Sequence, residues 1–373
     1  MIKQELTYWF TLAMIPKIWT RKKNEIYVRC YNHIPRISII QLFEEPSVWR
    51  ELGLDENEIN MFSEAQKMLP NNSFIVEELL AQGYKIIPID SPDYPQTLKN
   101  NLKIAAPSII FTKGNIDLLK QDSVAIVGSR KADEMSIAFT RNVSRKTVAE
   151  NKVVVSGFAK GVDRHALDTA VECNGKSIIV LPQGITTFAS GFKKYYKQIT
   201  QGNVLVISTF HPKAPWSVEF AMARNPIIYG MAKYIYVAQS EDKGGTWSGV
   251  NDGLKKGRKI FIRMPEKDEK NANYQLIKMG AVPVDINGYN VNVDIASIAD
   301  GNAKDNYEKR IIELLRSGPK SSKDVLKSLD IPWSDFKMKK YLRQNSQIEE
   351  YKNNNRIYFH LKGTLSPDLF GFM

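Results

Sequence analysis

The sequence predicts an α/β fold with a parallel β-sheet at its core, and two features of one stretch carry this prediction. Two β-branched runs, Val124–Val127 and Val153–Val155, each end in a Gly/Ser turn that leads into a helix. The segment Ser136–Glu150 between them has apolar residues near the helical period of about 3.6 residues. A strand, a crossover helix and a second strand in this order predict a parallel sheet. The unbroken apolar runs indicate that both faces of the sheet are covered.

Strands and helices are expected to alternate along the rest of this region. Residues 83–89 predict an edge strand, because Pro88 has no N–H to donate to a neighbouring strand. Further strands are expected at 109–112, 177–181, 204–208, 234–238 and, as the last strand, 259–263. Helices are expected at 166–173, 220–229 and 247–256.

The first 80 residues are expected to be helical. Leu6, Trp9 and Phe10 belong to an apolar helix face, and two more helices are expected at 39–43 and 59–69. Pro16 interrupts the first helix, and Pro46 and Pro70 are expected to end the other two. A basic run of Lys17, Arg21, Lys22 and Lys23 is interpreted as a solvated face, with contact to DNA as the alternative.

The C-terminal part has the pattern of a winged helix. Residues 285–305 contain few large apolar groups and predict a linker. Three helices at 307–315, 323–329 and 335–343 are followed by alternating strands at 347–351 and 356–360. The third helix carries Lys337, Lys339, Lys340 and Arg343. These side chains favour either contact with duplex phosphates or, as an equally open alternative, a role in protein contacts.

Composition narrows the class of protein. The 373-residue chain has a formal net charge of +12, which favours polyanionic partners or membrane surfaces. Its two cysteines, Cys30 and Cys173, and its four histidines show no metal-ligand spacing, so no metal site is expected. The low cysteine content fits a protein of the reducing cytoplasm. No apolar run approaches the 18 residues that a membrane span needs, and the first residues do not predict a secretory signal.

The turns after the strands predict an anion site. Gly128, Gly157 and Gly161 allow close backbone approach, and Arg130 and Lys160 add positive charge. In an open parallel sheet, ligands bind beyond the carboxyl ends of the strands, where helix N-termini present unpaired N–H groups. A third such turn, Gly244-Gly245-Thr246, follows the strand expected at 234–238.

Three motifs resemble the DNA-processing protein A (DprA/Smf) family. They are Val127-Gly128-Ser129-Arg130, Ser156-Gly157-Phe158-Ala159-Lys160-Gly161-Val162-Asp163 and Arg224-Asn225-Pro226-Ile227-Ile228-Tyr229-Gly230. The upstream segments 93–98 and 107–114 are also similar to the family's entry segment, so the resemblance covers residues 84–283. Pro226 departs from the pattern, because family members have an arginine at this position.

The resemblance implies a domain order and a function. It implies a small helical domain at 1–82, similar to helix-hairpin-helix modules, a Rossmann-like domain at 83–285, a linker at 286–304 and a winged-helix domain at 305–363. The implied function is to bind and protect single-stranded DNA and to load the recombinase RecA in natural transformation or recombination. The family forms homodimers, and neither a catalytic residue nor a cofactor is implied.

The expected contacts with DNA lie on the glycine turns and on the segment that starts at Arg224. The expected DNA-binding residues are Gly128, Ser129, Arg130, Ser156, Gly157, Phe158, Lys160, Gly161, Arg224, Asn225, Gly244, Gly245 and Thr246. Backbone N–H groups are expected to cradle phosphates, the three cations Arg130, Lys160 and Arg224 to neutralise them, and Phe158 to stack on bases. This interpretation requires the three cations to face one cleft and to stay out of internal ion pairs.

Several alternatives remain open on the sequence alone. A phosphoribohydrolase would carry a glutamate after its glycine turn, where this chain has Trp247-Ser248-Gly249-Val250. A sensor of nucleotide signals on the same scaffold is a third possibility. The cluster Lys193-Lys194-Tyr195-Tyr196 fits either nucleic-acid contact or an amphipathic surface helix, while Asp163 is expected to be an N-cap and His165 to start a helix near the ligand.

Overall fold

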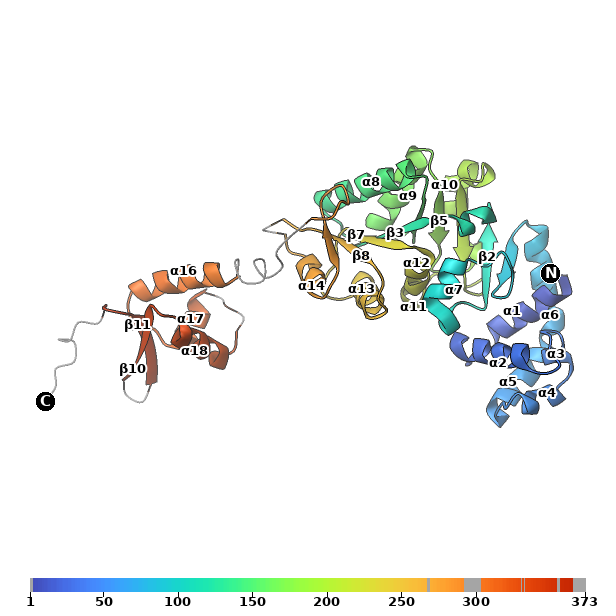
Figure 1. Ribbon diagram of the computed structural model, residues 1–373, viewed down its shortest axis with the longest axis horizontal. Helices are drawn as coiled ribbons and strands as arrows, with labels where there is room; N and C mark the ends of the chain where they lie inside the picture. The colour runs from blue at the N-terminus through green and yellow to red at the C-terminus, as the bar shows by residue number, and fades with distance from the viewer. Residues whose placement is uncertain are drawn as a thin grey trace. The chain divides into compact units, whose positions relative to one another are not determined.

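The computed structural model describes residues 3–266, 269–291, 303–329, 331, 333–353 and 356–364. The chain divides into two compact units, Met1–Asn292 and Val293–Met373, which are treated separately below. Figure 1 shows the first unit as a sheet with helices on both faces and the N-terminal helices beside one edge.

A nine-stranded sheet forms the centre of the first unit within the described ranges, in the order β1-β2-β6-β5-β4-β3-β7-β8-β9 (Figure 1). The strands are β1 (Lys85–Pro88), β2 (Ile109–Lys113), β3 (Ser123–Val127), β4 (Val153–Ser156), β5 (Ser177–Val180), β6 (Val204–Ser208), β7 (Tyr234–Val237), β8 (Ile260–Arg263) and β9 (Val282–Val284). All pairings from β6 to β9 are parallel, as predicted, and β1 is an edge strand.

Two features of the sheet differ from the prediction. Strand β2 pairs antiparallel with both β1 and β6, so the sheet is mixed rather than wholly parallel. The strand expected to be the last, β8, is followed by β9, which pairs with it in parallel. Strand β9 has three residues with Pro283 at its centre, which is too short and too proline-rich for a strand pattern to register.

Helices cover both faces of the sheet. One face, which carries Val124 and Ile126 of β3, packs against α8 (Glu134–Ala149) and α9 (Val162–Glu172). The other face, which carries Ala125 and Val127, belongs to the larger core. The remaining helices around the sheet are α7 (Gln96–Leu102), α10 (Ala189–Thr200), α11 (Val218–Ala223), α12 (Asn225–Met231), α13 (Gly245–Lys255) and α14 (Asn273–Lys278). Burial on both faces explains why Val124–Val127 of β3 form an unbroken apolar run.

The N-terminal helices share a core with the sheet. They are α1 (Lys3–Met14), α2 (Thr20–Asn32), α3 (Gln41–Glu44), α4 (Ser47–Glu51), α5 (Glu56–Lys67) and α6 (Leu69–Ala81). Buried Asn24 of α2 donates to the carbonyls of Ile104 and Ala106, and Phe10 of α1 packs edge-on against Phe111 of β2. These helices and the sheet belong to one compact unit, Met1–Asn292, and the domain boundary expected at residue 82 stays a prediction.

Two details of these helices correct the sequence prediction. Pro70 does not end a helix but lies in the first turn of α6, where its missing N–H has no helical partner to lose. Lys23 does not lie on a solvated face: it is buried, and its Nζ donates to the carbonyl of Ala13 at 2.6 Å. Burial lowers the pKa of Lys23 to about 8.

The second unit contains the expected three helices and two strands. These are α16 (Ala303–Arg316), α17 (Ser322–Leu329), α18 (Asp335–Gln344) and an antiparallel pair, β10 (Ile348–Asn353) and β11 (Arg356–Leu361). Ser334 caps α18 by accepting a hydrogen bond from the N–H of Lys337. The winged-helix assignment and any nucleic-acid contact by this unit stay predictions. Most of the expected linker, residues 292–302, lies outside the described residues.

The first residues of the expected linker, 286–291, are described and belong to the first compact unit. They contact helix α8, where Lys146 donates a hydrogen bond to the carbonyl of Gly288 at 2.8 Å. Within the part of the chain that the structure describes, no helix has the length and apolar character to cross a membrane.

Candidate functional site

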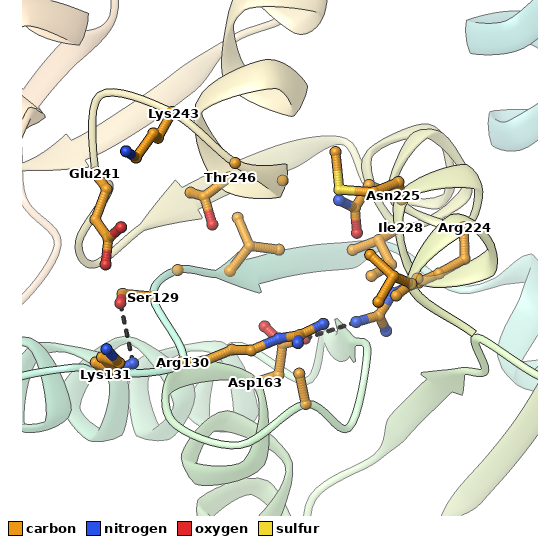
Figure 2. Close-up of a pocket in the computed structure, with 18 of the residues that line it drawn as sticks. Ser129, Arg130, Lys131, Asp163, Arg224, Asn225, Ile228, Glu241, Lys243 and Thr246 are labelled. Carbon is orange, nitrogen blue, oxygen red and sulfur yellow. Dashed lines mark hydrogen bonds and ion pairs between the residues drawn. The ribbon is translucent and has the colours of Figure 1, made fainter. Parts of the chain in front are cut away.

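A groove of about 390 Å³ lies at the carboxyl ends of β3, β4 and β7 (Figure 2). Strands β3 and β7 are neighbours, but the chain proceeds from β3 toward β6 in one direction and from β7 toward β9 in the other. The loops after β3 and β7 therefore separate at this point and leave a crevice, which is where open α/β sheets bind ligands. Residues 218–229 on α11 and α12 close the groove from the side.

Arg224 and Asp163 form a buried ion pair at the floor of this groove (Figure 2). The Nη2 atom of Arg224 lies 3.3 Å from Oδ2 of Asp163, and its Nη1 donates to the carbonyl of Val180 at 2.9 Å. Both side chains are more than nine-tenths buried. Arg224 therefore does not meet the condition that the sequence interpretation set, because its charge is matched inside the protein.

Asp163 is not the N-cap of α9, which is Gly161. Its carboxylate instead lies close to the backbone N–H groups of Gly157 and Ala159, in the turn that joins β4 to α9. Burial raises the pKa of the Asp163 carboxyl, while Arg224 and these two N–H groups oppose the rise. A glycine turn that the sequence assigned to a phosphate thus lies beside an internal carboxylate.

The glycines of the first two turns are needed for packing inside the protein. A Cβ atom on Gly157 would lie 1.4 Å from Nη1 of Arg224, so any side chain there would displace the guanidinium. A Cβ on Gly161 would lie 2.5 Å from the carbonyl oxygen of Ser129, and one on Gly128 would lie 2.7 Å from a methyl group of Val162. These contacts bring the loops after β3 and β4 together.

The Ser129 backbone is also occupied by internal hydrogen bonds. Its N–H donates to Gln239, its carbonyl accepts from Val162, and its hydroxyl accepts from the N–H of Lys131 (Figure 2). Ser156, at the end of β4, is buried and donates to the carbonyl of Ile126 at 2.7 Å. Both serines hold the loops in place, which differs from the phosphate contact expected of them.

The third glycine turn keeps the properties expected of an anion site. Helix α13 begins there, Gly244 is its N-cap with φ of +90°, and no side chain caps it. A Cβ on Gly244 would meet nothing within 4 Å, whereas one on Gly245 would lie 2.7 Å from Nδ2 of Asn225. Gly244, Gly245, Thr246 and Asn225 all line the groove. The uncapped N-terminus of α13 therefore adds partial positive charge to its wall.

Four exposed cations surround this region, and none has an ion-pair partner among the described residues. Arg130, Lys131 and Lys243 line the groove, with Lys243 facing Arg130 and Lys131 from the opposite side (Figure 2). Lys160 lies on the turn after β4 and lines an adjoining recess. Glu241 adds one negative charge to the groove wall, which is fewer than the positive charges of these cations, so the local net charge remains positive. Sequence reasoning missed Lys131 and Lys243, although each belongs to a turn that it had singled out.

The adjoining recess has a volume of about 230 Å³ and shares Arg130, Ala159, Ala221 and Arg224 with the main groove. The shared residues make the two cavities neighbours. Phe158 lines the recess, but Arg164 lies 3.5 Å from its ring centre, and Phe188 and Tyr195 contact it edge-on. The predicted stacking of bases on Phe158 therefore meets a ring that has one face covered.

The Lys/Tyr cluster of α10 forms an amphipathic surface helix, which was one of the two interpretations of the sequence. Lys194 pairs with Asp168 at 2.7 Å, and buried Tyr195 donates to the same carboxylate. None of residues 193–196 lines the groove or the recess. His165 lies in the first turn of α9, as expected, but outside both cavities.

The part of the chain that matches known proteins contains the residues that line this groove. The model of the family described as DNA recombination-mediator protein A matches residues 85–291. The DNA processing protein DprA of Streptococcus pneumoniae (strain ATCC BAA-255 / R6) is 34% identical over 158 residues, which is 42% of this chain and 55% of the relative. The DNA processing protein DprA of Bacillus subtilis (strain 168) is 26% identical over 208 residues, which is 53% of this chain and 67% of the relative.

A solved structure has the same fold. The X-ray structure of DNA processing protein A (DprA) from Streptococcus pneumoniae aligns with a TM-score of 0.61 and 23% identity, covering 76% of this chain and 95% of that chain. The sequence match to the first relative spans only about half of that relative's length, at 55%. The expected α/β fold with a mostly parallel sheet is confirmed.

Proposed function

Because the chain belongs to the DNA recombination-mediator protein A family, we propose that it binds single-stranded DNA along the groove and its adjoining recess, without catalysing a reaction. Nucleic-acid backbones are recognised mainly by cations that displace condensed counterions. The observation that carries the proposal is the group of four exposed cations, Arg130, Lys131, Lys160 and Lys243, that have no ion pair among the described residues.

The distribution of these cations favours a chain of phosphates over a single phosphate. Lys131 and Lys243 line only the main groove, Lys160 lines only the recess, and Arg130 lines both. A mononucleotide has one phosphate group and occupies one such position. A flexible single strand can pass from one cavity to its neighbour and bring successive phosphates to all four side chains.

Three further parts of the proposed function rest on family membership alone. We propose a recombinase of the RecA type as the protein partner, since the family is described as a recombination mediator. A homodimer and a cytoplasmic location stay predictions. That the chain catalyses no reaction is likewise proposed from family membership.

Titration of a fluorescent oligo-dT against the full chain, at two or more salt concentrations, tests this proposal. Four phosphate contacts predict that log K falls with log salt with a slope of about −3, from about 0.7 per contact on a single strand. Duplex DNA of equal length and thymidine monophosphate serve as the comparison ligands. Affinity that is independent of salt, or binding of the mononucleotide that equals binding of the oligonucleotide, would contradict the proposal.

A further inference from the structure

An apolar strip lies along one side of the cationic groove. Trp216, Val218 and Met222 have exposed fractions of 50%, 57% and 41%. Val218 and Met222 are four residues apart on α11, hence on one face of that helix, and both line the main groove. Trp216 lines the adjoining recess together with Arg130 and Lys160. Cations and exposed apolar side chains thus line the same cavities.

The backbone around Trp216 is fixed. The loop before it is bound to the turn after β5: Gly184 donates to the carbonyl of Ala214 at 2.9 Å, and Thr186 donates to Pro212. A Cβ on Gly184 would lie 2.1 Å from the Pro212 carbonyl oxygen, so this close contact requires glycine. Trp216 is therefore presented by a held segment rather than by a loose one.

The segment after Trp216 is equally constrained. Ser217 caps α11 by accepting a hydrogen bond from the N–H of Phe220 at 3.1 Å. The ring of Phe220 stacks on Phe210 with a centroid distance of 4.4 Å. Within the described residues no ring contact or hydrogen bond of the Trp216 side chain is found, in contrast to the packed Phe158. An exposed indole on a fixed backbone has the properties of a stacking platform, since little backbone freedom remains to be lost when a base stacks on it.

We propose that Trp216 is a base-stacking platform, with Val218 and Met222 continuing an apolar wall along which the bases lie while Arg130, Lys131, Lys160 and Lys243 hold the phosphates. This inference rests on the proposed binding of single-stranded DNA and adds the site that contacts the bases. The charge distribution selects this occupant: a single strand has an anionic backbone on one side and apolar base faces on the other. The wall and the cations match these two sides.

The test compares two ligands of equal charge on the full chain: fluorescent oligo-dT and an abasic oligonucleotide with the same number of phosphates. Trp216→Ala should weaken binding of oligo-dT about 5- to 150-fold, the range that loss of one base–aromatic stack produces. It should leave binding of the abasic strand within about twofold of wild type, because the phosphate contacts remain. Trp216→Phe should restore most of the affinity for oligo-dT.

Trp19→Ala is the matched control, since Trp19 is 85% exposed and lines neither cavity. It should bind both ligands as wild type does. Unchanged binding of oligo-dT by Trp216→Ala would overturn the stacking role, and so would an equal loss on both ligands. Wild-type protein that binds neither ligand would overturn the proposed function itself, which is a distinguishable result. Unfolding midpoints of the variants, measured alongside, should coincide with that of wild type.

Discussion

Arg224 and Asp163 lie 61 residues apart in the sequence and form an ion pair of 3.3 Å beneath the groove, with both side chains almost fully buried. The pair connects the α11–α12 segment to the turn after β4. The sequence suggested that Arg224 neutralises a phosphate. Its guanidinium is instead held by Asp163 and by the carbonyl of Val180, and it supports the groove from below. Removal of this ion pair should therefore lower the stability of the fold more than it weakens DNA binding.

Arg224→Ala should destabilise the first unit by about 3–5 kcal/mol, because Asp163 is left as a buried charge without a partner. Urea unfolding followed by circular dichroism measures this loss. The double variant Arg224→Met with Asp163→Leu should lose less than the sum of the two single changes, since it leaves no charge unpaired. Additive losses would show that the two residues stabilise the fold independently.

Gly157→Ala should destabilise the protein more than Gly244→Ala does. The added methyl group on Gly157 would lie 1.4 Å from the Arg224 guanidinium and would break its ion pair. Gly244 has open space around it, so alanine there costs only the strain of a positive φ, about 1–2 kcal/mol. Thermal unfolding of the two variants checks the order, and equal midpoints would contradict this account of Gly157.

Arg130→Ala, Lys160→Ala and Lys243→Ala should each weaken binding of single-stranded DNA and leave the unfolding midpoint unchanged. Each change removes one phosphate contact, so the salt slope should become shallower by about 0.7. Fluorescence titration at several salt concentrations measures the slope. Lys255→Ala is the matched control: it lies at the far end of α13, about 15 Å from the turn at Gly244. A similar change of slope in this control would indicate nonspecific attraction.

Lys23→Met should stabilise the protein at pH 7, by up to about 3 kcal/mol, because wild type buries a charged ammonium group there. The pKa of Lys23 is about 8 in the folded protein against 10.5 for an ordinary lysine. Between these values the unfolded chain binds more protons, so the stability of wild type rises with pH. The advantage of the variant is therefore complete below pH 8 and shrinks as the pH approaches 10.5.

Urea unfolding at pH 7 and pH 10 measures this difference. Lys22→Met is the control for loss of a lysine charge from the same helix, since Lys22 reaches Glu58 near the surface at 2.8 Å. A stability difference between wild type and Lys23→Met that stays constant from pH 7 to pH 10 would contradict the assignment of Lys23 as the titrating group.

Most of the strands could be predicted because their signal is local. Strands β3, β4 and β6 are apolar except for one terminal serine each, and burial of both sheet faces imposes that composition on each run separately. Strand β9 and the antiparallel pairing of β2 could not be predicted in this way. A three-residue strand around Pro283 has almost no pattern, and the direction of β2 depends on its neighbour β6, far along the chain.

The sequence by itself determined the α/β core, the three glycine turns at the ends of its strands and the excess of positive charge. Only the tertiary structure decided what those residues do. Gly157 is a glycine because Arg224 fills the space beside it, and Arg224 itself is held there by buried Asp163. The cations Lys131 and Lys243 meet across one groove because β3 and β7 are neighbours. The physical reason is that turn propensity depends on a few neighbouring residues and net charge on composition. Ion pairing, close packing and exposure depend instead on which distant residues fill the same space.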